Sequence, residues 1–207
     1  MGCVPFNKIK NYLMEAIFVS VSINLIYINS CPWHKTSERR IVAEITLKGN
    51  ACNTCGDLPA VGADAPEFTL VGGDLSDATL ASFAGKKVII NTMPSFDTPV
   101  CALSVKAFNE KVGSLDNTVV VNVSKDLPFA QKRFCESNQL EHVTNLSAFR
   151  CDGFGNSFGV SIVDGPLKGL LARSVVVLDT EGKVTYSELV SEIAQEPNYD
   201  AAVAAVS

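Results

Sequence analysis

Apolar residues run through the middle of the chain in short blocks of two different periods. Residues 87–92 and 118–124, K-V-I-I-N-T and T-V-V-V-N-V-S, are nearly continuous runs of the kind seen in parallel strands buried on both faces. Between them, apolar positions recur at helical spacing, which predicts a helix over residues 99–112. Those positions are Cys101, Val105, Phe108 and Val112. Strand, helix and strand in this order are typical of a βαβ unit with a right-handed crossover.

The same pattern extends on both sides of this unit. Residues 42–47, followed by K-G-N and a second short segment, predict a β-hairpin with a Gly-Asn turn. A helix is expected from Pro128, with Asp126 as its cap and Cys135 at its far end. The other expected elements are a short strand within residues 61–70, a turn and short helical piece over 74–85, a strand over 143–149, a helical turn over 154–159, an apolar strand from Arg173 to Asp179, a hairpin turn at Glu181-Gly182 into a strand over 183–190, and a helix over 199–206.

The first 40 residues differ in character from the rest. Lys8 and Lys10 precede an apolar run over residues 16–28, which is short and polar for a membrane span but has the length of a signal-peptide core. Glu15 at its edge and the lack of an A-x-A-like cleavage site speak against export. Three interpretations stay open: a leader or extension without function, an export signal, and an anchor through residues 1–31. We place the boundary near Arg40, with one domain over residues 41–207.

Composition narrows the class of protein. With 207 residues, 47% of them hydrophobic, the chain can bury one good core. The net charge is -5, and residues 44–207 carry 12 Lys or Arg against 20 Asp or Glu, so an acidic body makes nucleic acid a poor partner. Seven cysteines leave at least one thiol unpaired. Such usage fits a reducing compartment, and we expect a cytoplasmic protein.

Cys101 lies in the first turn of the helix predicted over residues 99–112. Backbone N–H groups without intrahelical partners and the positive end of the helix dipole favour thiolate over thiol there. Thr98 is expected to place its hydroxyl beside the sulfur, and Asp97 and Ser95 are expected to cap the turn. From spacing alone, a reactive cysteine and a buried, inert one are equally open.

Several separated motifs share one resemblance. P-S-F-D-T-P-V-C, residues 94–101, resembles the active-site loop of the thiol peroxidases, an atypical two-cysteine branch of the peroxiredoxins with the pattern P-x-x-x-T-x-x-C. S-x-D-L-P-F-A-Q-x-R-F-C, ending at Cys135, and G-L-x-A-R-x-V-V-V, containing Arg173, are similar to two further segments of that family. With G-x-x-A-P-x-F from Gly62 and E-I-x-x-E-P-x-Y-x-A-A from Glu192, the resemblance covers residues 44–206.

The resemblance implies a fold and an activity. The fold would be the thioredoxin-like α/β fold of peroxiredoxins, with a central mixed sheet flanked by helices and an N-terminal β-hairpin. The activity would be thiol-dependent reduction of hydrogen peroxide and organic hydroperoxides, serving antioxidant defence and redox homeostasis. Thioredoxin would be the reductant and a homodimer the assembly, with no cofactor and no metal. The preferred peroxide is left open.

The resemblance also implies roles for single residues. Cys101 would attack the peroxide and become a sulfenic acid, in a pocket shaped by Thr98 and Pro94. Arg173 would stabilise the thiolate and polarise the peroxide oxygens. Cys135 would resolve the sulfenic acid through an intramolecular disulfide with Cys101. Without the resemblance, a half-buried helical cysteine at 135 and a solvated arginine at 173 would be the preferred interpretations.

A second pair of cysteines supports a different hypothesis. Cys52 and Cys55 form a C-x-x-C motif in the predicted hairpin, as in a thioredoxin-like disulfide exchanger or thiol carrier. The pair is also half of a possible zinc site, but neither His34 nor His142 has suitable spacing to complete it. An incidental pair is the simpler interpretation. Nothing around Cys151 indicates chemistry, so it is a spare thiol.

Overall fold

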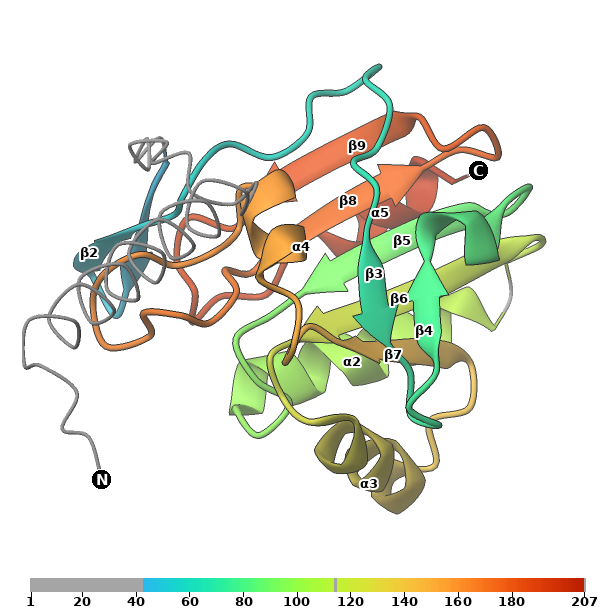
Figure 1. Ribbon diagram of the computed structural model, residues 1–207, viewed down its shortest axis with the longest axis horizontal. Helices are drawn as coiled ribbons and strands as arrows, with labels where there is room; N and C mark the ends of the chain where they lie inside the picture. Colours follow the sequence, from blue (N-terminus) through green and yellow to red (C-terminus); the bar gives the residue numbers. More distant parts are fainter. Residues whose placement is uncertain (1–42, 114, 207) are drawn as a thin grey trace, which may run out of the picture. The chain divides into compact units, whose positions relative to one another are not determined.

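In the computed structural model, which describes residues 43–113 and 115–206, seven strands form one mixed sheet (Figure 1). Their order is β4-β3-β7-β6-β5-β8-β9. The strands are β3 (Thr69–Val71), β4 (Asp77–Thr79), β5 (Lys87–Thr92), β6 (Thr118–Ser124), β7 (Val143–Ser147), β8 (Ser174–Leu178) and β9 (Val184–Leu189). The predicted leader and its boundary near Arg40 lie outside the described residues.

The centre of the sheet is parallel and its flanks are antiparallel. β5 pairs in parallel with β6, and β6 with β7, whereas β8 runs antiparallel to β5. The register places Asn91 opposite Asn122 and Asn122 opposite Asn145. All five residues of β8 are buried, as expected for a strand covered on both faces. Because β5 and β6 are parallel neighbours joined through the helix at residues 99–112, the predicted βαβ unit is confirmed.

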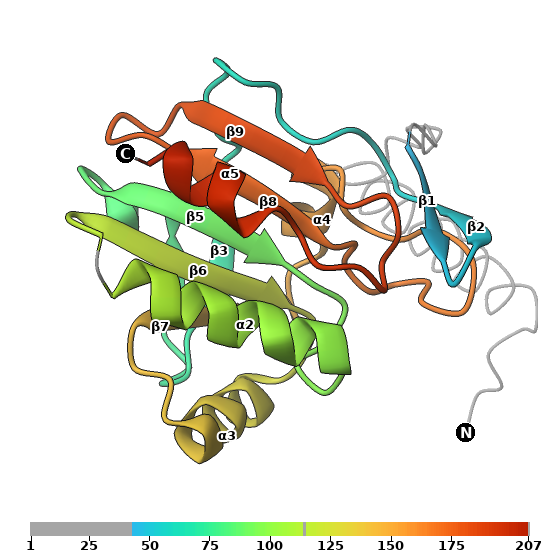
Figure 2. The same ribbon diagram turned by 180° about the vertical axis from the view of Figure 1, so that it is seen from behind.

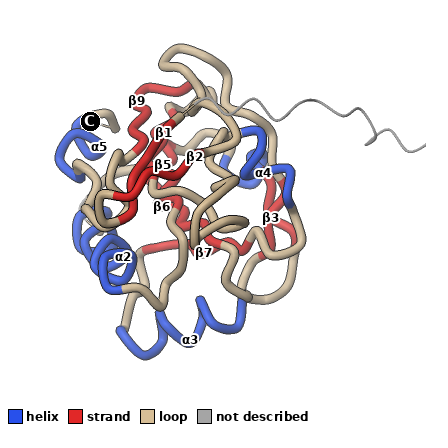
Figure 3. Tube along the Cα trace, turned by 90° about the vertical axis from the view of Figure 1, so that its left-hand side faces the viewer, coloured by secondary structure: helices blue, strands red, loops and turns tan. Residues whose placement is uncertain are grey.

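Helices cover both faces of this sheet (Figures 2 and 3). α2 (Pro99–Val112) and α5 (Tyr199–Ala204) lie on one face, where the rings of Phe108 and Tyr199 meet edge to face at 5.1 Å. α4 (Asp152–Ser157) lies on the other, and α3 (Pro128–Asn138) packs near β7. A short 3-10 helix, η1, spans Leu80–Phe83. Among the described helices, none has the length and apolar character needed to cross a membrane.

The predicted element bounds agree closely with the structure in the βαβ unit and less well elsewhere. The strands over 87–92 and 118–124 and the helix over 99–112 have the predicted ends. The segment 74–85 contains strand β4 before its short helix, which the turn-like composition had hidden. α3 continues to Asn138, beyond the predicted end at Cys135.

The predicted helix caps were wrong. Thr98 occupies the N-cap position of α2 and Leu127 that of α3, and neither makes a side-chain capping bond. Instead, the Ser95 hydroxyl donates a hydrogen bond to the Asp126 carboxylate at 2.8 Å, so each side chain is engaged with a residue far away in the sequence and not with a helix end. Asp97 is exposed.

The predicted N-terminal hairpin is present, with its turn one residue earlier than expected. β1 (Glu44–Leu47) and β2 (Asn50–Asn53) pair antiparallel, and Leu47 lies opposite Asn50. The two-residue loop is Lys48-Gly49, with φ of 52° and 78°. Positive φ at both central residues matches the twist of a hairpin, which is why glycine suits the second position.

The carboxylate of Glu192 fastens this hairpin to the body of the domain. It accepts hydrogen bonds from the backbone N–H groups of Lys48 (2.9 Å), Gly49 (3.0 Å) and Ala194 (3.0 Å), and from the Thr46 hydroxyl (2.8 Å). These bonds, with that from Ala194 contributing most, lower the pKa of Glu192 to about 2. Hydrogen bonds favour the charged form that accepts them.

Protonation or loss of this carboxylate should loosen the hairpin. Because the folded-state pKa is depressed, its stabilisation is present above the ordinary glutamate pKa and is lost as pH falls towards 2. Amide exchange at Lys48 and Gly49, measured by NMR, should therefore rise relative to the sheet amides in acid. Glu192→Gln should produce this rise at neutral pH, and the exposed Glu44→Gln serves as the matched control. Unchanged exchange at Lys48 and Gly49 in Glu192→Gln would contradict the fastening role.

Candidate active site

The side chains of Cys101 and Arg173 are in contact inside the protein, beyond the strand ends where β5 finishes and β8 starts. Nη2 of Arg173 donates a hydrogen bond to Sγ of Cys101 at 3.2 Å. The cysteine is 0% exposed and the arginine 1%. Nε of Arg173 donates to the Ile193 carbonyl at 2.9 Å, while Nη1 is buried without a hydrogen-bond partner. A buried guanidinium with one free donor faces the thiol.

Local structure explains how these two side chains meet. Cys101 is the third residue of α2, after Pro99, whose missing N–H costs little in a first turn. Arg173 immediately precedes β8, and antiparallel pairing places Ser174 opposite Thr92 at the end of β5. The Thr92 hydroxyl bonds to the Ala172 carbonyl and to the Ser174 hydroxyl, each at 2.7 Å. The strand that delivers Arg173 is thereby fixed to the strand that leads to Cys101.

Asp126 holds the loop between β5 and α2 in place. Its carboxylate accepts hydrogen bonds from the Ser95 hydroxyl, the Phe96 backbone N–H and the Ser124 hydroxyl, each at 2.8 Å. The loop before Cys101 is thus tied to the end of β6. Sequence reasoning missed this role because it depends on a contact across 30 residues, and the only available signal was a polar residue following an apolar strand.

Thr98 and Pro94 belong to the same loop, between β5 and α2. The Thr98 hydroxyl donates to the Ser95 carbonyl at 3.1 Å, so its proton is engaged with the backbone and its oxygen remains an acceptor. Thr98 was expected to place this hydroxyl beside the sulfur, and in the structure the hydroxyl proton is directed at the backbone of its own loop. Pro94 is buried one residue after Met93.

Cys135 belongs to the same apolar cluster as Cys101, together with Met93, Phe96 and Val105. The ring of Phe96 packs edge to face on that of Phe134 at 5.3 Å. Sγ of Cys135 accepts a hydrogen bond from Nδ2 of Asn145 at 2.9 Å. Burial raises the pKa of the Cys135 thiol above its ordinary value, and the Asn145 bond lowers it in part. Both thiols are free.

One side of Cys135 faces a hollow of about 750 Å³ between α3, β7 and the turn that joins β3 to β4. Lys132 and Glu136 of α3 line it, and Asp74 contributes from the turn. Cys101 does not line this hollow. The two thiols therefore share an apolar cluster but differ in their surroundings.

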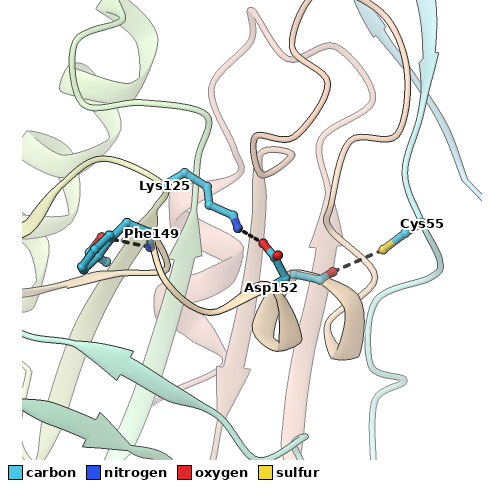
Figure 4. Close-up of polar contacts among 6 residues, drawn as sticks. Cys55, Lys125, Phe149 and Asp152 are labelled. Atoms are coloured by element: carbon cyan, nitrogen blue, oxygen red, sulfur yellow. Dashed lines mark hydrogen bonds and ion pairs between the residues drawn. The ribbon is translucent and has the colours of Figure 1, made fainter. Parts of the chain in front are cut away.

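The remaining cysteines of the described chain lie away from this cluster. Cys52 is 2% exposed in β2, and its pKa is raised by burial and then by the negative charges of Asp164 and Glu192. Figure 4 shows Cys55 pointing at α4, where its Sγ donates to the Gly155 carbonyl at 3.3 Å. Cys151 directly precedes α4. Cys52 is buried and the Cys55 thiol is engaged with a backbone carbonyl, so this geometry does not favour the disulfide-exchanger hypothesis.

The described residues contain no group of three or more His, Cys, Asp and Glu side chains positioned to share a metal ion. Cys52 and Cys55 therefore have no further ligands of this kind within residues 43–113 and 115–206.

Comparison with known proteins shows the family of the chain. The family model described as Redoxin matches residues 60–203. Thiol peroxidase from Mycobacterium tuberculosis is 58% identical over 165 residues, which are 80% of this chain and 99% of that protein. Thiol peroxidase from Corynebacterium glutamicum is 50% identical over 166 residues, 80% of this chain and 100% of that protein.

Solved structures show the same relationship. A peroxiredoxin-like protein from Aquifex aeolicus superposes with a TM-score of 0.75 at 44% identity, covering 80% of this chain and 96% of the other. A thiol peroxidase from Chromobacterium violaceum superposes with a TM-score of 0.72 at 25% identity, covering 76% and 91%. The thioredoxin-like peroxiredoxin fold expected from the motifs is thereby confirmed. The chain belongs to the Redoxin family and, within it, to the thiol peroxidases.

Proposed function

We propose that this thiol peroxidase reduces hydroperoxides with Cys101 as the attacking thiolate and Arg173 as its charged partner. The observation that supports the proposal is the buried Arg173 guanidinium. Its Nη2 donates a hydrogen bond to the Cys101 sulfur at 3.2 Å, and its Nη1 has no hydrogen-bond partner. A buried polar hydrogen without an acceptor costs free energy. A peroxide oxygen beside the sulfur would satisfy it.

The first chemical step follows from these contacts. The Cys101 thiolate attacks one peroxide oxygen, an S–O bond forms, and the O–O bond breaks. The departing oxygen leaves with the bonding pair and takes up a proton as water or an alcohol, while Cys101 becomes a sulfenic acid. Arg173 stabilises the charge that develops on the departing oxygen. The Thr98 oxygen accepts the peroxide O–H, and Pro94 forms part of the pocket wall.

Cys135 completes the oxidative half of the cycle. Its thiolate attacks the Cys101 sulfur, an S–S bond forms, and the S–O bond breaks to release hydroxide, which is protonated to water. An external dithiol then exchanges with the disulfide and restores both thiols. Thioredoxin is the proposed dithiol. Two exposed apolar residues, Leu127 just before α3 and Phe129 in its first turn, offer thioredoxin a contact next to the helix that carries Cys135.

Two wider assignments accompany this mechanism. A homodimer is proposed from the family resemblance, and Leu103, exposed on α2 near Cys101, is available for such an interface. A cytoplasmic location is proposed from cysteine usage, because seven cysteines leave at least one thiol unpaired, which fits a reducing compartment.

Serine variants separate the two cysteine roles. Cys101→Ser should abolish peroxide turnover, because a hydroxyl at this position is not ionised at neutral pH. Cys135→Ser should still consume about one equivalent of peroxide and then stop, because sulfenic acid forms but no disulfide does. Stopped-flow peroxide consumption with thioredoxin, thioredoxin reductase and NADPH measures both, and Cys151→Ser is the matched control. Normal turnover by Cys101→Ser would reject the assignment.

Replacing Arg173 by lysine tests whether the geometry of its hydrogen bonds matters in addition to its positive charge. Arg173→Lys keeps the positive charge but loses the planar fork that reaches both the Ile193 carbonyl and the sulfur. The rate of Cys101 oxidation should fall roughly 100-fold, the effect of removing one preorganised donor from a buried site. Arg150→Lys, at the surface, should leave this rate unchanged. A fall of less than about threefold in a folded Arg173→Lys protein would contradict the role.

Disulfide formation should loosen α3. The two sulfurs are held by different partners, Arg173 and Asn145, and both cysteines lie within helices, so bond formation requires these contacts to break. Amide exchange over residues 129–139 should be faster in the oxidised than in the reduced protein, as measured by mass spectrometry. Slower exchange in the oxidised protein would count against this motion.

A further inference from the structure

A row of three amides, buried at Asn91 and Asn122 and half-buried at Asn145, crosses the sheet and ends on the Cys135 sulfur. The Ser104 hydroxyl donates to Oδ1 of Asn91 at 3.3 Å, and Nδ2 of Asn91 donates to Oδ1 of Asn122 at 2.8 Å. Nδ2 of Asn122 donates to Oδ1 of Asn145 at 3.0 Å, and Nδ2 of Asn145 donates to Sγ of Cys135 at 2.9 Å. The row follows the register of three neighbouring strands, β5, β6 and β7. Its bond to Ser104 of α2 places it on the face that α2 covers, and Figure 2 shows α2 lying over these strands.

All donors in this row point the same way. Each amide N–H₂ faces the Cys135 side and each amide oxygen faces Ser104, which lies on α2 one turn after Cys101. Aligned hydrogen bonds polarise one another and strengthen the last donor of the chain. The partial positive charge of the row is therefore presented to the sulfur.

Packing alone does not account for this row. Asn91 and Asn122 are 0% exposed, within strands made mostly of Ile and Val. Asparagine is unfavourable in strands, and replacing hydrogen-bonded pairs by apolar residues of similar shape can be nearly neutral for stability. A thiol accepts hydrogen bonds weakly, so it is a poor terminal acceptor for a row whose role is only structural. A thiolate, by contrast, is a charged and strong acceptor.

We propose that Asn145 is a catalytic residue of the disulfide step, whose amide stabilises the Cys135 thiolate, and that Asn122 and Asn91 are positioning residues that aim it. The inference rests on the proposed function, in which Cys135 attacks the Cys101 sulfenic acid. The same donor serves the return reaction, when an external dithiol attacks the Cys101 sulfur and Cys135 leaves with the bonding pair as a thiolate.

The charged groups near Cys135 do not themselves stabilise its thiolate. Burial acts against the thiolate and raises the pKa of Cys135, while the Asn145 bond lowers it. Lys132 and Glu136, one turn apart on α3, face the same hollow with charges 3.9 Å apart, and Glu141 and Asp74 also line it. Since these groups carry more negative than positive charge, the neutral amide is the group that opposes the cost of burial.

The test follows the second step in isolation. The full-length reduced protein receives one equivalent of hydrogen peroxide with dimedone present as a sulfenic-acid trap, and rapid quench with peptide mapping measures trapped Cys101 against the Cys101–Cys135 disulfide. In Asn145→Val, disulfide formation at neutral pH should slow roughly tenfold, as expected for a lost hydrogen bond to a charged group. Trapped Cys101 should increase accordingly. The rate of sulfenic acid formation should not change.

The pH dependence distinguishes this role from a structural one. Losing the donor raises the pKa of Cys135, so the rate of disulfide formation in Asn145→Val should recover at alkaline pH, with its midpoint about one pH unit higher. Asn122→Val should move the midpoint in the same direction by less. Asn156→Val, the same substitution at an exposed position of α4 away from this hollow, is the matched control and should behave as wild type.

A second variant covers the case in which Asn145→Val does not fold. Asn145→Asp has the same shape, keeps the acceptor for Asn122 and loses the donor to sulfur, so it should slow the step at least as much. Wild-type rate and midpoint in either folded variant would overturn the inference. If wild-type protein itself forms no Cys101–Cys135 disulfide, the proposed function fails instead, so the two failures are distinguishable.

Discussion

The structure of this site depends on a buried cation without a carboxylate partner. Arg173 is 1% exposed, and none of the ion pairs within the described residues involves it. Removing a charge from water costs several kcal/mol unless a partner compensates. The group placed at its Nη2 is the Cys101 sulfur, so a thiolate there would form the missing ion pair. The pairing of β8 with β5 and the bond to the Ile193 carbonyl serve to keep this geometry.

The two thiols are held by opposite parts of the same sheet. Cys101 faces a full positive charge delivered by β8, whereas Cys135 faces a neutral amide delivered by β7. Asp126 joins the two regions, because it holds the loop before Cys101 from a position just ahead of α3. This arrangement suits a cycle in which the first thiol reacts with peroxide and the second waits until a sulfenic acid has formed.

Local pattern was sufficient for the βαβ unit and insufficient for the site. Periodicity predicted the ends of β5, α2 and β6 because those elements are long, apolar and bounded by Pro or polar residues. The contact of Arg173 with Cys101 spans 72 residues, and no local rule predicts it. Only the resemblance carried by the G-L-x-A-R motif predicted a role for Arg173 beside Cys101. The cap expected at Asp126 failed because a tertiary partner, the Phe96 N–H, outweighed the local preference.

The amide row shows the same limit. Asn91 and Asn122 are visible in the sequence as polar interruptions of apolar strands, but only the register reveals that they align with Asn145. Polar residues in otherwise continuous apolar runs are therefore worth testing for a common row once strand order is known.

The central claim is that one equivalent of peroxide converts Cys101 and Cys135 into a disulfide through a sulfenic acid. Intact mass and peptide mapping of the reduced wild-type protein after one equivalent of hydroperoxide test it most directly. The account predicts loss of two hydrogens per chain and one linked peptide pair containing Cys101 and Cys135. A link between Cys52 and Cys55, or a sulfenic acid at Cys101 that persists without any link to Cys135, would contradict it.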